Sequence, residues 1–138
     1  MKPEIASSLK KTIPTYLGPH LDKCYWQELQ FDGDQLELVV QEEEKSTSPV
    51  VVIRLTVSDD FKQIYISNIM MPMFLRRQGI GKGLIAKIYE VAKAFKYSLF
   101  LVQMTERFFD RMVKRGAVVI QEGDRVQITD QTNLKPDA

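Results

Sequence analysis

Hydrophobic positions in the first half of the chain alternate with polar ones or form short β-branched runs, which is typical of strands. Leu36 to Val40 begins with such an alternation, whereas Val50 to Val57 is almost continuously apolar, as in a strand covered on both faces. Cys24 to Phe31 and Gln63 to Met70 are also predicted to be strands. Turn signals such as Asp32-Gly33-Asp34 separate these runs, so the pattern favours an antiparallel meander of four strands.

Before these strands the sequence predicts only a short helix. Its residues, Glu4 to Lys11, precede Pro14 and a Gly18-Pro19 pair, and proline and glycine commonly end a helix. Between the second and third strands, Glu42 to Pro49 is polar and ends in a proline. We interpret this segment as an exposed hairpin loop, and its three glutamates as solvated side chains rather than an acid cluster.

After Pro72 the hydrophobic period changes to that of a helix. Apolar residues recur at helical spacing from Ile80 to Phe95, with lysines and a glutamate on the other face. A short buried strand, Leu99 to Val102, follows this helix. A strand, a helix and a strand in succession predict a right-handed crossover, so this strand should run parallel to the one that ends at Met70.

A second amphipathic helix is predicted from Glu106 to Arg115, ended by Gly116. Val118 to Gln121 and Arg125 to Thr129 flank a Gly-Asp turn signal, so they predict a hairpin. The last residues, Asn133 to Ala138, are expected to be frayed.

These elements predict an α+β fold with one mostly antiparallel sheet flanked by helices, and a parallel strand pair joined by the helix that follows Gly81. A chain of 138 residues suits a single domain spanning positions 1–138. The 19 basic and 18 acidic side chains leave a net charge of +1, which argues against a nucleic-acid-binding protein.

Cysteine and histidine each occur once, at Cys24 and His20, so no metal site is expected. A lone cysteine suits a reducing compartment, and we expect a cytoplasmic protein. No apolar run approaches the roughly 20 residues of a membrane-spanning helix, so no membrane association is expected.

The segment from Arg76 to Gly83, with the sequence RRQGIGKG, has the composition of an anion-binding loop. Its glycines permit tight turns, and the helix that begins there offers unpaired N–H groups and a partial positive charge. A P-loop would have glycine at position 76 and serine or threonine at position 83, and a dinucleotide-binding fingerprint would have glycine or alanine at Leu84. The spacing excludes both motifs and leaves a phosphorylated cofactor as the favoured anion.

The pattern Arg76-x-x-Gly79-x-Gly81, placed after an apolar strand and before a long amphipathic helix, resembles the Arg/Gln-x-x-Gly-x-Gly/Ala motif of the GNAT N-acetyltransferases. The similarity extends from about Val50 to Thr129 and is weaker over residues 1–45. It implies an enzyme that transfers an acetyl group from acetyl-CoA to a primary amine of a small molecule or a protein. A homodimer is also compatible with the resemblance.

The resemblance further implies that acetyl-CoA lies where the fourth and fifth strands separate. Backbone groups near Ile69 and Met71 would pair with the pantetheine arm, and the loop and first helical turn would bind the pyrophosphate. The implied CoA-binding residues are Ile69, Met71, Arg76, Arg77, Gln78, Gly79, Ile80, Gly81 and Lys82.

Two features depart from the family pattern. The tyrosine that protonates the leaving thiolate in many members is replaced within Phe108-Phe109, and we expect Phe109 to stand in its place. The glutamate that often acts as the general base is absent from the fourth strand. Tyr65, Ser67, Asn68 and Gln103 could each order a water, or could be structural, so the sequence identifies no catalytic residue. An acyl-CoA-binding module with little or no activity is therefore the alternative hypothesis.

Overall fold

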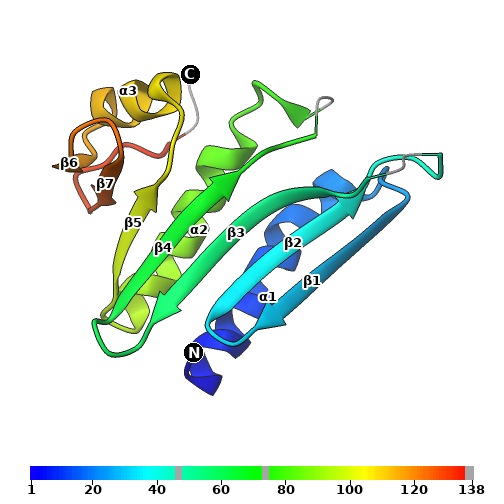
Figure 1. Cartoon of the computed structure of the whole chain (residues 1–138), viewed down its shortest axis with the longest axis horizontal. Coiled ribbons are helices and arrows are strands. Elements are labelled where there is room, and N and C mark those ends of the chain that lie inside the picture. Colours follow the sequence, from blue (N-terminus) through cyan, green and yellow to red (C-terminus); the bar gives the residue numbers. More distant parts are fainter. Residues whose placement is uncertain (46–47, 73–74, 136–138) are drawn as a thin grey trace.

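The computed structural model describes residues 1–45, 48–72 and 75–135. Within these ranges three helices accompany a seven-stranded sheet, whose strand order is β1-β2-β3-β4-β5-β7-β6 (Figure 1). The elements in chain order are α1 (Pro3–Leu21), β1 (Trp26–Asp32), β2 (Gln35–Gln41), β3 (Val50–Ser58), β4 (Gln63–Ile69), α2 (Ile80–Ala94), β5 (Ser98–Val102), α3 (Glu106–Lys114), β6 (Val118–Gln121) and β7 (Arg125–Ile128).

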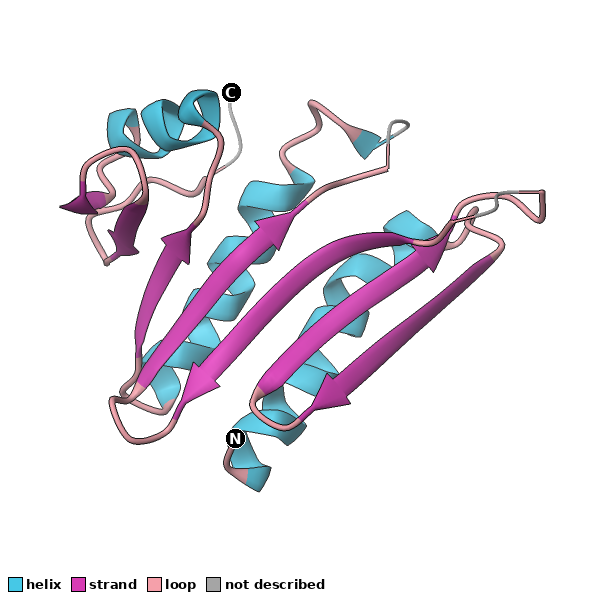
Figure 2. Ribbon diagram, in the orientation of Figure 1, coloured by secondary structure: helices cyan, strands magenta, loops and turns pink. Residues whose placement is uncertain are grey.

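The sheet is antiparallel except where β4 and β5 lie side by side in parallel. Their register begins at Gln63 opposite Ser98 and ends at Ile66 opposite Leu101, and α2 makes the crossover between them. Helices α1 and α2 lie next to each other on one face of the sheet (Figure 2). The predicted α+β fold, with its single parallel pair, is confirmed.

The prediction for the first helix is wrong in length. Helix α1 has 19 residues and contains both Pro14 and Pro19. Its inner face carries an apolar residue at every fourth position, and each of these side chains is at most 1% exposed: Ile5, Leu9, Ile13, Leu17 and Leu21. Burial of one such side chain contributes about 1.5–3 kcal/mol, so five together contribute about 7.5–15 kcal/mol and outweigh the cost of about 6 kcal/mol for two interior prolines.

Helix α1 packs closely against the first turn of α2. The Tyr16 hydroxyl donates a hydrogen bond to the carbonyl oxygen of Ile80 at 3.1 Å. A Cβ atom on Gly83 would lie only 2.0 Å from that hydroxyl oxygen, so glycine at this position permits the close approach. As a result, α1 braces the end of α2 at which the RRQGIGKG segment lies.

Replacing Tyr16 by phenylalanine removes this bond and preserves the ring. We expect the free energy of unfolding to fall by about 1 kcal/mol, the usual contribution of one hydrogen bond. Urea denaturation measures the change. Tyr25→Phe is the matched control, because Tyr25 is 58% exposed and its replacement should leave stability nearly unchanged. An equal loss in both variants would contradict the assigned role of the Tyr16–Ile80 contact.

Residues 133 and 134 contact the rest of the fold. The backbone N–H of Asn133 donates a hydrogen bond to the carbonyl oxygen of Arg115 at 2.7 Å. In return, the Arg115 guanidinium donates to the backbone carbonyl oxygen of Asn133. Leu134 packs against the core. These contacts involve positions 133 and 134, positions 136–138 lie outside the described residues, and the fraying of the tail stays a prediction. In the predicted hairpin loop, positions 42–45 and 48–49 are indeed outside the strands, and 46–47 are not described.

None of the helices in the described ranges is long and apolar enough to cross a membrane.

Candidate functional site

Strands β4 and β5 separate beyond their last paired residues, Ile66 and Leu101 (Figure 2). On the other side of β4, Arg54 pairs with Asn68 whereas the next residue, Leu55, pairs with Ile66. Ser67 is thus an extra residue in β4, and such a bulge bends a strand and increases its twist. The bend at Ser67 coincides with the point at which β4 leaves β5.

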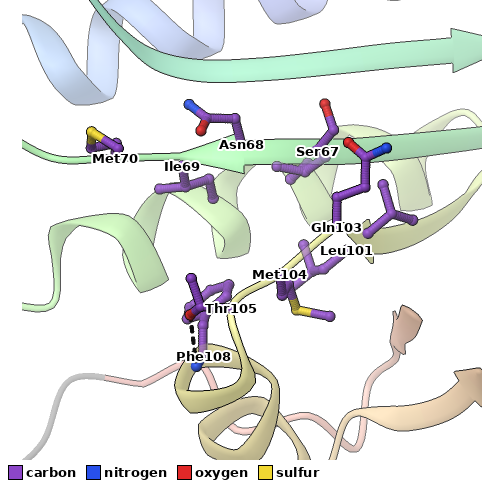
Figure 3. A pocket seen from close by; sticks show the side chains of 11 residues that line it. Ser67, Asn68, Ile69, Met70, Leu101, Gln103, Met104, Thr105 and Phe108 are labelled. Atoms are coloured by element: carbon purple, nitrogen blue, oxygen red, sulfur yellow. Dashed lines mark hydrogen bonds between the residues drawn. The ribbon is translucent and has the colours of Figure 1, made fainter. Parts of the chain in front are cut away.

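A cavity of about 160 Å³ opens where the two strands part (Figure 3). Ser67 and Asn68 of β4 lie across from Gln103 and Met104, which follow β5. All 11 lining residues are uncharged: Ile66, Ser67, Asn68, Ile69, Met70, Leu101, Val102, Gln103, Met104, Thr105 and Phe108. The cavity is therefore neutral and mostly apolar, with a few polar groups, as is common in sites for small organic groups.

Three of the four residues that could order a water line this cavity. The side chain of Asn68 donates to the carbonyl oxygen of Val51 at 2.9 Å, which fixes its orientation. Gln103 adopts a positive φ of 55°, a conformation that costs energy for a residue other than glycine and that concentrates at functional sites. Tyr65 does not line the cavity. Its ring stacks on that of Phe100, with 5.6 Å between the ring centroids.

A second, larger groove of about 720 Å³ lies between the start of α2 and one face of α3. Ile69 and Phe108 line both the groove and the neutral cavity, so the two spaces meet at these side chains. The groove is lined by Ile69, Met71, Leu75, Arg76, Arg77, Gly79, Ile80, Gly81, Lys82, Arg107, Phe108, Arg111, Met112 and Arg115.

The first turn of α2 presents its backbone to this groove. Gly79 is the N-cap residue and has a φ of 74°, in the left-handed region that favours glycine. Having no side chain, it cannot cap the first N–H groups of the helix, and such groups together with the helix dipole favour an anion. A Cβ on Gly81 would lie 3.4 Å from Cγ2 of Ile69, so this glycine keeps the groove wall clear beside β4.

Arginines of the loop have two roles. The Nε of Arg76 donates to the carbonyl oxygen of Met71 at 3.2 Å, which ties the end of β4 to the entry of α2. Arg77 has a φ of 66°, which shows that the loop turns sharply before Gly79. The exposed positions of both arginines place positive charge at the groove.

The structure places eight of the nine predicted CoA-binding residues along this groove. They are Ile69, Met71, Arg76, Arg77, Gly79, Ile80, Gly81 and Lys82. Gln78 is exposed and does not belong to the lining.

Sequence reasoning missed the opposite wall of the groove. Arg107, Arg111 and Arg115 of the α3 segment contribute three further cations there. Their spacing of four residues places them on one helical face, and this spacing was the available signal.

Sequence reasoning also expected Phe109 to replace the family's tyrosine. Phe109 is instead buried in the core at 3% exposure, and the phenylalanine at the site is Phe108.

The single cysteine lies elsewhere. Burial and the neighbouring Glu42 raise the pKa of the Cys24 thiol, so it stays protonated near neutral pH and is a poor nucleophile. Among the described residues no three histidine, cysteine, aspartate or glutamate side chains are grouped so that they could hold a metal ion.

Residues 6–112 match the sequence model of the acetyltransferase (GNAT) family, which is more than half of the chain. The chain belongs to this family. The GNAT assignment agrees with the fold, because the sheet, its parallel pair and the α2 crossover occur where the hydrophobic pattern predicted them, and the Arg76 to Gly81 motif lies at the start of α2.

Solved structures with a similar fold include nourseothricin acetyltransferase, with 13% identity, a TM-score of 0.44 and coverage of 70% of this GNAT chain. The chain spans 64% of the length of that protein. Another is the CoA-dependent acyl-homoserine lactone synthase BjaI, with 15% identity, a TM-score of 0.47 and coverage of 91% of this chain and 78% of the synthase. Comparison with curated protein sequences finds no match.

Proposed function

We propose that this GNAT protein is an N-acetyltransferase that moves an acetyl group from acetyl-CoA to a primary amine of a small molecule or a protein. One observation carries the proposal: a basic groove at the N-terminus of α2 is continuous with a neutral cavity between β4 and β5. Acetyl-CoA has matching parts, since its charged phosphates and its uncharged thioester lie at opposite ends of one long molecule.

The residues present fit this co-substrate. Gly79 and Gly81 leave the backbone of the α2 entry open to a phosphate, and Arg76, Arg77 and Lys82 supply positive charge there. Beyond Ile66 the edge of β4 that faces β5 has no paired strand among the described residues. Its backbone groups from Ser67 onwards would bind the amide-containing pantetheine arm.

Bound acetyl-CoA would supply the thioester carbon that the amine attacks. The chain's contribution would be to orient the two reactants and to keep water out, and positioning alone can account for a large part of a rate enhancement. Ser67, Asn68 and Gln103 are polar side chains that could hold the acceptor or a water at the neutral cavity.

Native mass spectrometry of the purified protein tests the proposal first, because CoA or acetyl-CoA should be retained under gentle conditions. Thiol release from acetyl-CoA is then measured over a panel of polyamines, amino acids and peptides. Retained CoA together with turnover of at least one amine supports an N-acetyltransferase. A protein that binds neither CoA nor acetyl-CoA in calorimetry would overturn the proposal.

Phe108 favours the alternative, a CoA-binding module with little activity, because it lies at the cavity without a hydroxyl group to protonate the leaving thiolate. In an active enzyme, Phe108→Tyr should bind acetyl-CoA as the wild type does and should increase acetyl transfer. General acid assistance is worth up to about 10²–10⁴-fold, although a thiolate with a pKa of about 8.5 leaves fairly well unaided.

Phe109→Tyr is the matched control for this prediction. Phe109 is 3% exposed in the core, so a hydroxyl there should destabilise the fold by about 1–3 kcal/mol without increasing transfer. The assay compares thiol release by wild type and both variants over the same amines. Tight CoA binding with no turnover by wild type or Phe108→Tyr would support the binding module instead.

A further inference from the structure

The groove between α2 and α3 carries more positive charge than a pyrophosphate group requires. Among the described residues that line it, six are basic and none is acidic. Arg76, Arg77 and Lys82 stand at the α2 entry, where the helix dipole also favours an anion. The other three cations are Arg107, Arg111 and Arg115 on the facing wall.

The facing wall belongs to one side of α3. Arg107 and Arg111 are one helical turn apart, both are exposed, and Phe108 and Met112 beside them form the apolar part of the same wall. Within the described ranges neither arginine forms an ion pair with a carboxylate. Arg115 differs, because its guanidinium already donates to the carbonyl oxygen of Asn133.

CoA has a third phosphate whose chemistry suits this wall. Each phosphate of the pyrophosphate bears one negative charge, whereas the 3′-phosphate is a monoester with a charge of about −1.5 to −2 at neutral pH. An arginine guanidinium matches the oxygens of a phosphate with two parallel hydrogen bonds, which makes it the preferred partner for such a group. Two arginines on one helical face can therefore hold a terminal phosphate.

We propose that Arg107 and Arg111 bind the 3′-phosphate of CoA, so that the protein distinguishes CoA from dephospho-CoA, which lacks only that group. This inference rests on the proposed use of acetyl-CoA. It assigns the pyrophosphate to the entry of α2 and the 3′-phosphate to α3, on opposite walls of one groove.

Calorimetric titration with CoA and with dephospho-CoA tests the proposal directly. Wild type should bind CoA at least about tenfold more tightly, since a charge-assisted hydrogen bond is worth that factor or more. Arg107→Gln and Arg111→Gln should each weaken CoA binding by about tenfold and leave dephospho-CoA binding unchanged. The ratio of the two dissociation constants should thereby move toward one.

Lys114→Gln is the matched control, because it removes one positive charge from an exposed position of the same helix outside the groove lining. It should preserve the preference of the wild type for CoA. Arg111→Lys, which keeps the charge but loses the paired donors, should retain part of the preference. Melting curves of each variant verify that the fold is intact, and both arginines are exposed enough that their replacement should not unfold the protein.

Each outcome has a distinct meaning. Equal binding of CoA and dephospho-CoA by wild type would overturn the 3′-phosphate site and leave the proposed transferase intact. An equal loss of preference in Lys114→Gln and Arg111→Gln would overturn it too, because the general positive field of α3 would then be the cause. Failure of wild type to bind either ligand would overturn the proposed use of acetyl-CoA as well.

Discussion

Replacing Gly81 by glutamate should abolish the binding of acetyl-CoA, with a loss in affinity of at least about a hundredfold. A side chain here would begin 3.4 Å from Cγ2 of Ile69 and extend into the space proposed for the pyrophosphate. It would also add a negative charge where phosphate is expected. Loss of two charge-assisted hydrogen bonds, each worth about 1.5–3 kcal/mol, is enough for a hundredfold effect.

Calorimetry and ligand-dependent melting measure this effect. At a ligand concentration one hundred times the dissociation constant, binding stabilises wild type by about 2.7 kcal/mol, and this gain should vanish in Gly81→Glu. Gly18→Glu is the control, because a Cβ at Gly18 in α1 would meet no atom within 4 Å and would not enter the groove. Identical CoA binding by wild type and Gly81→Glu would mean that the phosphates lie elsewhere.

The rate of acetyl transfer should rise about tenfold per pH unit between pH 6 and pH 9 for an alkyl amine acceptor. Only the neutral amine can attack the thioester, and an amine with a pKa of about 10.4 is almost fully protonated in this range. Each unit of pH below that pKa therefore lowers the neutral fraction tenfold. All 11 residues that line the cavity are uncharged, so we expect the profile of kcat/KM to follow the acceptor's own pKa.

Acceptors of different basicity provide the control for this pH profile. An aliphatic amine and a weakly basic aromatic amine should give profiles displaced by the difference between their pKa values. A plateau at the same pH for both acceptors would reveal a protein group that acts as the base, because its pKa would not depend on the acceptor. Rates without protein must be subtracted, since thioesters also hydrolyse in alkaline solution.

The regular elements could be predicted from the sequence because their hydrophobic periods are strong. The α2 segment has an apolar residue at nearly every inward position, and β3 is apolar over most of its length, so each pattern has one interpretation. The length of α1 could not be read in this way. The prolines predict that the helix ends early, whereas the apolar residues from Ile5 to Leu21 predict that it continues. The helix continues because those apolar side chains are buried in the folded protein, which the sequence alone does not show.

The α2 side of the groove was predictable in part because its glycine and arginine positions follow one another in the chain. The α3 wall was not, because which face of a helix meets a distant loop depends on tertiary packing. The same cause explains why Phe109 was wrongly expected at the site. Neighbouring residues of a helix point in different directions, so Phe108 lines the cavity while Phe109 lies in the core. The bulge at Ser67 also depends on pairing with β3, which no local pattern encodes.

In the proposed arrangement, the charged groove would bind the phosphate groups of CoA and the neutral cavity would bind the acyl group, so different residues contact each part of the donor. Met70 and Met104 line only the cavity, and methionine is flexible enough to accommodate side chains or ligands of different shape. If the cavity holds the acyl group as proposed, changes at these two positions would alter the length of the acyl chain that fits, while every arginine of the groove would stay in place. This arrangement would allow the acyl-group specificity to change, in evolution or by mutagenesis, while the affinity for the CoA moiety is retained.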